Sequence, residues 1–153
     1  MIDIFTHILP PKYRGALEKL GAIKRISLSQ IEALQRSNPG LLDVTLRLKV
    51  MDEFPDIMQV LTMVGPPLEA IAETEDTVGL AKIANDEMAE LVARHPDKFV
   101  AVATLPMNNV DAALKEVDRA IKDLKLRGVQ LFTSINDKPL DSPEFLPLYQ
   151  KMA

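Results

Sequence analysis

The chain has 153 residues, of which 47% are hydrophobic and 26% charged, and its formal net charge is −4. This balance is typical of a soluble globular domain with a real core, and the mild acidity argues against a nucleic-acid-binding surface. There is no cysteine, which excludes disulfides and thiolate ligands and fits a cytoplasmic location, and no apolar run is long enough to span a membrane.

The first predicted element is a short strand that runs from Ile2 to His7. Side chains alternate between the two faces of a strand, so Asp3, Phe5 and His7 point to the same side. His7 comes last, just before the double proline Pro10-Pro11. A neutral imidazole at the carboxyl end of a strand is a suitable zinc ligand, but a histidine that only caps the strand end fits the same pattern.

Strand-length apolar runs and helical patterns alternate along the rest of the chain. Further strands are predicted over 56–63, 99–105 and 128–133. Helices are predicted over 29–36, 41–54, 75–94 and 110–126, with a last one opening at Asp141-Ser142-Pro143. Thr74 and Asn109 are the expected caps of the two long helices, and His95-Pro96 ends the first of them.

This alternation predicts an α/β fold of parallel βαβ units. The order fits a doubly wound sheet, or about four of the eight units of a (β/α)8 barrel, which needs about 250 residues. The last segment keeps apolar residues at helical spacing up to Ala153. This pattern predicts either a C-terminal helix that ends there, or a chain that stops inside or just after its fourth βα unit.

Four segments together resemble the amidohydrolase superfamily, in the branch of aminocarboxymuconate-semialdehyde and resorcylate-type decarboxylases. They read I-D-I-x-T-H-I-L-P-P (from residue 2), V-M-D-E-F-P-D-I-M-Q-V-L-T (from residue 50), N-D-E-M-A-E-L-V-A-R-H-P-D-K-F-V-A-V-A-T-L-P-M (from residue 85) and L-R-G-V-Q-L-F-T-S-I-N-D-K-P-L-D-S-P-E-F-L-P-L-Y (from residue 126). The resemblance implies one partial metal-dependent hydrolase domain over 1–153, the N-terminal half of a TIM-type (β/α)8 barrel.

The same resemblance implies a divalent metal, usually zinc, at the carboxyl ends of the strands. The family begins with His-x-His, or with Glu-x-His in some decarboxylases. The second member falls on His7, while the first falls on Phe5, which cannot bind a metal, and further family ligands lie beyond Ala153. His7 is therefore the one expected metal ligand, and Asp3 is either a group that orients a histidine or a structural acid.

A substrate pocket is expected from polar side chains at or just past the ends of the second to fourth strands. These are Thr62, Thr104, Thr133 and Asn136. Turn and cap roles explain them nearly as well. His95 lies on the amino-terminal side of a strand, the stability face of a barrel, and Arg47 is interpreted as a helix-surface or packing residue.

The expected function is metal-dependent hydrolysis or non-oxidative decarboxylation of a small carboxylic acid, with little or no activity from this chain alone. The alternative is a non-catalytic ligand-binding or scaffold domain that has lost the metal. Four strands without a closing wall leave open edges and an uncovered apolar face. We therefore expect a homo-oligomer, or association with a complementing C-terminal half.

Overall fold

The computed structural model describes residues 1–20, 33 and 36–153. Its sheet consists of three parallel strands in the order β1-β2-β3, which are Ile2–Ile8, Met58–Met63 and Phe99–Ala101. The predicted strands over 2–7, 56–63 and 99–105 are thus confirmed, the last of them in a shorter form. Strand β1 lies at an edge of the sheet, whereas the doubly wound alternative would place it in the middle.

The fourth predicted strand, 128–133, is present only as a short extended stretch beside β3. Ala103 and Val129 form an isolated parallel bridge, and the Gln130 amide donates a hydrogen bond to the Ala103 carbonyl at 2.8 Å. The Gln130 side chain then bonds to both the amide and the carbonyl of Met63, at 2.8 and 3.1 Å. The fourth unit therefore follows the third in the sheet, but its backbone ladder is too short to form a strand.

The helices and helical turns follow the strands in the expected alternation. They are α1 Pro11–Lys19, η2 Pro39–Leu41, α3 Val44–Asp52, α4 Leu68–Ile71, α5 Thr74–Arg94, α6 Val110–Asp118, η3 Arg119–Asp123, η4 Pro143–Phe145 and α7 Leu146–Met152. Helices α3, α5, α6 and α7 confirm predictions, whereas α1 and α4 were not foreseen. The helix predicted over 29–36 falls almost entirely outside the described residues.

The two expected caps have different outcomes. The Asn109 side chain accepts a hydrogen bond from the Ala112 amide at 3.0 Å, so Asn109 caps α6 as predicted. Thr74 is not a cap, because α5 begins one residue earlier than expected. Glu73 occupies the cap position, and its side chain forms no capping hydrogen bond.

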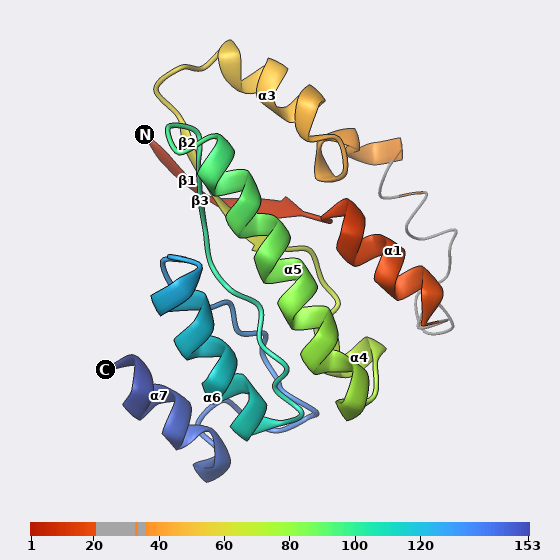
Figure 1. Cartoon of the computed structure of the whole chain (residues 1–153), viewed down its shortest axis with the longest axis vertical. Helices are drawn as coiled ribbons and strands as arrows, with labels where there is room; N and C mark the ends of the chain where they lie inside the picture. Colours follow the sequence, from red (N-terminus) through yellow and green to blue (C-terminus); the bar gives the residue numbers. More distant parts are fainter. Residues whose placement is uncertain (21–32, 34–35) are drawn as a thin grey trace.

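Helix α1 is held in place by a residue far away in the sequence. The buried Glu87 carboxylate, on α5, accepts hydrogen bonds from the backbone amides of Lys12 and Tyr13, the shortest at 2.9 Å. Free amides and the helix dipole make the first turn of a helix attractive to a carboxylate. Helix α1 therefore lies along α5 (Figure 1) because a side chain 75 positions away satisfies its first turn.

One face of the sheet is covered by helices and the other is open. Leu61, Ala101 and Ala103 are fully buried in the core beneath the helices. Thr62 and Val102, which alternate with them, are only half-buried on the opposite face. In Figure 1, α5 lies across the sheet, with α6 beside α5 and α7 beside α6. In the described part of the chain, no helix is long and apolar enough to cross a membrane.

Candidate functional site

The site begins at the carboxyl end of β1, where His7 is exposed. Parallel pairing places His7 directly beside Thr62 of β2. The Thr62 hydroxyl oxygen lies 2.7 Å from His7 Nδ1 and 2.9 Å from the carbonyl oxygen of Thr6. The register of the sheet thus joins two of the residues proposed from the sequence, His7 and Thr62, in one hydrogen-bonded unit.

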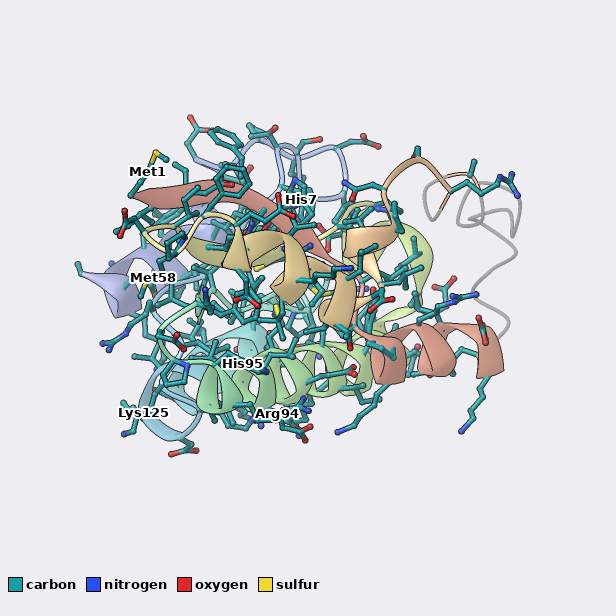
Figure 2. The ribbon with its side chains drawn as sticks, turned by 90° about the horizontal axis from the view of Figure 1, so that it is seen from above. Met1, His7, Met58, Arg94, His95 and Lys125 are labelled. Carbon is teal, nitrogen blue, oxygen red and sulfur yellow. The ribbon has the colours of Figure 1, made fainter. Side chains whose placement is uncertain are left out.

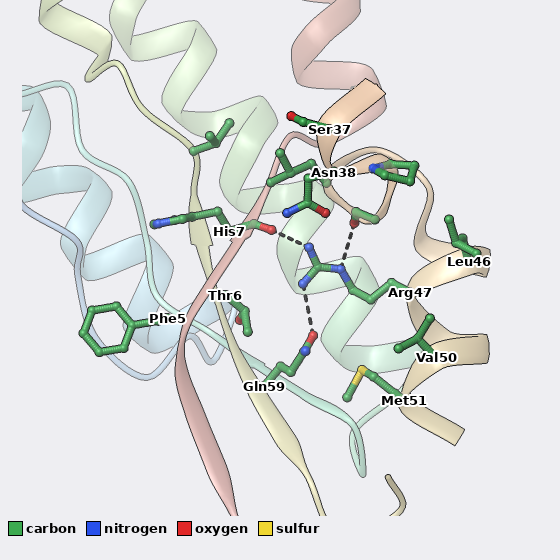
Figure 3. A pocket seen from close by; sticks show the side chains of 14 residues that line it. Phe5, Thr6, His7, Ser37, Asn38, Leu46, Arg47, Val50, Met51 and Gln59 are labelled. Atoms are coloured by element: carbon green, nitrogen blue, oxygen red, sulfur yellow. Dashed lines mark hydrogen bonds between the residues drawn. The ribbon is translucent and has the colours of Figure 1, made fainter. Parts of the chain in front are cut away.

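Phe5 stands on the same side of β1 as His7 (Figure 3). Its ring is 84% exposed and offers no donor to a metal. Asp3, which comes before it on β1, is half-buried, and its carboxylate accepts a hydrogen bond from the Phe5 amide at 3.1 Å. Asp3 is therefore the structural acid of the two alternatives, with its carboxylate bonded to its own strand.

The described residues do not complete a metal site. Tight zinc sites use three or four protein ligands. Within residues 1–20, 33 and 36–153, no three His, Cys, Asp or Glu side chains gather into a group that could hold a metal ion. His7 contributes one imidazole, and the position two residues before it carries a phenyl ring. The described residues therefore supply one ligand of such a site.

A cavity of about 660 Å³ lies behind β1, between that strand, residues 37–41 and α3. Arg47 reaches into it and donates three hydrogen bonds: to the Gly40 carbonyl at 3.0 Å, to Gln59 Oε1 at 3.0 Å, and to the His7 carbonyl. Figure 3 shows the His7 ring on the other side of the strand, pointing away from the guanidinium. Arg47 therefore bonds to the backbone of His7 and not to its imidazole.

Arg47 was interpreted from the sequence as a helix-surface or packing residue, and its hydrogen bonds are what that interpretation missed. Burial lowers the pKa of the Arg47 guanidinium, and the nearby Asp3 carboxylate acts in the opposite direction. The signal in the sequence is helical spacing. Val44 and Met51 lie three residues before and four after Arg47, so these side chains share one face of α3, which turns toward the sheet.

The remaining proposed pocket residues belong to the third and fourth units of the fold. Thr104 is buried, and its backbone amide and carbonyl are both bonded to the side chain of Asn85. Thr133, the last residue of the fourth extended stretch, and Asn136, just after it, are both exposed, and Asn136 borders a small cavity of about 110 Å³. A single pocket lined by Thr62, Thr104, Thr133 and Asn136 stays a prediction.

His95, the second histidine, is at the other end of the fold. It follows the last residue of α5, and its ring packs edge-on against Phe99, with the ring centroids 6.1 Å apart. Figure 2 shows His95 well separated from His7. This position agrees with the structural role expected from its place before β3.

Comparisons with known proteins place these features in a family. The profile of the family described as amidohydrolase matches residues 2–153. The 2-amino-3-carboxymuconate-6-semialdehyde decarboxylase of Dictyostelium discoideum is 27% identical over 161 residues, which cover 98% of this chain and 45% of that protein. The gamma-resorcylate decarboxylase of Rhizobium radiobacter is 37% identical over 116 residues, covering 71% of this chain and 36% of that protein.

A solved structure extends the likeness to the fold. The dihydroxybenzoic acid decarboxylase of Polaromonas sp. JS666, with bound manganese and the inhibitor 2-nitroresorcinol, superposes with a TM-score of 0.73 at 28% identity. The match covers 99% of this chain and 45% of that one. The chain thus spans less than half the length of these three proteins. With the profile matched along nearly its whole length, the chain belongs to the amidohydrolase family.

Proposed function

We propose that the chain carries the first-strand part of the active site of a divalent-metal-dependent, non-oxidative decarboxylase of an aromatic carboxylic acid. The observation that carries this proposal is the position of His7, whose imidazole stands at the carboxyl end of β1 on the open face of the sheet. The related proteins named above are decarboxylases, which favours decarboxylation over hydrolysis. One of them holds manganese, so Mn²⁺ joins zinc as a candidate ion.

One imidazole predicts weak metal binding. We expect Mn²⁺ or Zn²⁺ to bind reversibly to the purified chain, and His7→Ala to abolish that binding, as measured by equilibrium dialysis. His95→Ala is the matched control, because it removes the other histidine at a distance from the site. Metal binding that is unchanged in His7→Ala, or absent from the wild type, contradicts the proposal.

Catalysis by this chain alone is expected to be below detection, because the described residues supply one metal ligand and do not form a complete metal site. Release of CO2 from 2,6-dihydroxybenzoate is the direct assay. The second candidate is a non-catalytic domain that has kept the fold and lost the metal, and the exposed phenyl ring at position 5 favours it. A thermally stable protein that binds no metal supports this candidate.

We also expect the chain to associate, as a homo-oligomer or with a complementing C-terminal half. Strand β1 is an edge, and it exposes Ile2 by 64% and Ile4 by 61%. Unpaired edges with apolar side chains favour pairing with another chain, and a lysine on the edge opposes it. In sedimentation velocity at micromolar concentration, Ile4→Lys should shift the protein toward monomer, whereas Leu146→Lys, on α7, should not. A wild type that sediments as a monomer contradicts this expectation.

A further inference from the structure

The hydrogen bonds around Thr62 determine which nitrogen of His7 carries the proton. A threonine hydroxyl has a single hydrogen to donate but can accept through its lone pairs. Thr62 Oγ1 lies 2.9 Å from the Thr6 carbonyl oxygen and 2.7 Å from His7 Nδ1. A carbonyl oxygen can only accept, so the hydroxyl hydrogen points to Thr6. The short contact with His7 therefore needs a hydrogen on Nδ1.

The opposite arrangement is unfavourable. If Thr62 donated to Nδ1, its oxygen and the Thr6 carbonyl oxygen would face each other at 2.9 Å without a hydrogen between them. Arg47 adds a second restraint, because its hydrogen bond to the His7 carbonyl holds the backbone that carries the ring.

We propose that Thr62 is a positioning residue that fixes His7 as the Nδ1–H tautomer and turns the lone pair of Nε2 toward the open face of the sheet. Which ring nitrogen is free is set by the hydrogen bond that the other one makes. That Nε2 would bind a metal ion rests on the proposed function. The tautomer itself depends only on the contacts of the metal-free protein.

The test is ¹⁵N NMR spectroscopy of the two histidine rings in the full chain. With ¹⁵N-labelled histidine and no metal, at about pH 9, where a histidine ring carries one proton, His7 should appear as the Nδ1–H form. Thr62→Val keeps the shape of the side chain but removes the hydroxyl, so His7 should shift toward Nε2–H. Thr62→Ser keeps the hydroxyl and should retain the wild-type pattern.

The controls separate this inference from general damage to the fold and from the proposed function. Thr45→Val, at an exposed position on α3, should leave the His7 signals unchanged. An Nε2–H form in the wild type, or an Nδ1–H form that persists in Thr62→Val, overturns the inference. If Thr62→Val does not fold, the wild-type and Thr62→Ser spectra still show which ring nitrogen of His7 carries the hydrogen. A wild type with Nδ1–H that binds no Mn²⁺ supports the tautomer and contradicts the proposed function.

Discussion

Phe5→His is expected to raise the affinity of the chain for Mn²⁺ or Zn²⁺ by roughly 10- to 100-fold, or about 1.4–2.8 kcal/mol of binding free energy. Residues two apart on a strand project from the same face, and Figure 3 shows the side chains at positions 5 and 7 on one side of β1. The phenyl ring at position 5 is exposed, so an imidazole can replace it without disturbing the core. Isothermal titration with each metal measures the gain.

A matched variant shows whether geometry or a mere added histidine produces the effect. Ile4→His places an imidazole at an exposed position three residues before His7 instead of two, where the pairing of β1 with β2 shifts register, so its spacing does not match the family motif. It should bind metal no better than the wild type. Phe5→His combined with His7→Ala should lose the gain. Equal gains in Phe5→His and Ile4→His would show that the two positions of the family motif do not face a common site.

The elements that depend on local pattern were predictable from the sequence. Helix α5 has an apolar stripe along its whole length and a histidine-proline stop, and both of its boundaries come within one residue of the prediction. The α/β class, with about four βα units of a TIM-type barrel, and the resemblance to amidohydrolase-type decarboxylases are likewise confirmed. Apolar periodicity carries this information because it records which side of each element is buried.

Features that depend on distant residues were not predictable. Pro11 reads as a stop after the first strand, yet it is the first residue of α1, where proline is well tolerated. The helix forms there because Glu87 satisfies its first amides, and no local pattern shows that contact. The fourth strand fails for a related reason. Strand pairing is decided between chain segments, and 128–133 makes one bridge with its neighbour.

The site divides in the same way. The sequence places His7 and Thr62 at strand ends, but the register that makes them neighbours follows from the pairing of β1 with β2. Thr104 is a similar case. It lies near the end of the predicted strand 99–105, and the sequence pattern does not show that its backbone amide and carbonyl bond to the side chain of Asn85 on α5.

Asn85→Ala is expected to lower the free energy of unfolding by about 3–5 kcal/mol, because it removes the centre of a buried polar network. Asn85 is 0% exposed, and its side chain pairs with both backbone groups of Thr104, at 2.9 and 3.0 Å. The same amide donates to Glu116 Oε1 at 2.7 Å. Glu116 is 3% exposed and depends on Asn85 and Arg119 to compensate its charge.

Alanine at position 85 leaves the backbone amide and carbonyl of Thr104 without partners in the core, at about 1–3 kcal/mol for each group. It also removes one of the two hydrogen bonds to Glu116 Oε1, which keeps its bond from Arg119. That loss is a large fraction of the roughly 5–15 kcal/mol of a typical domain, and urea denaturation measures it. Asp86→Ala is the matched control: it removes the half-exposed outer partner of Arg119 and should change stability by about 0–1 kcal/mol. Equal losses in the two variants would mean that water satisfies the network. A selective loss in Asn85→Ala would indicate that α5 and α6 stabilise the segment after β3 through this amide, at the same carboxyl end of the parallel sheet as His7.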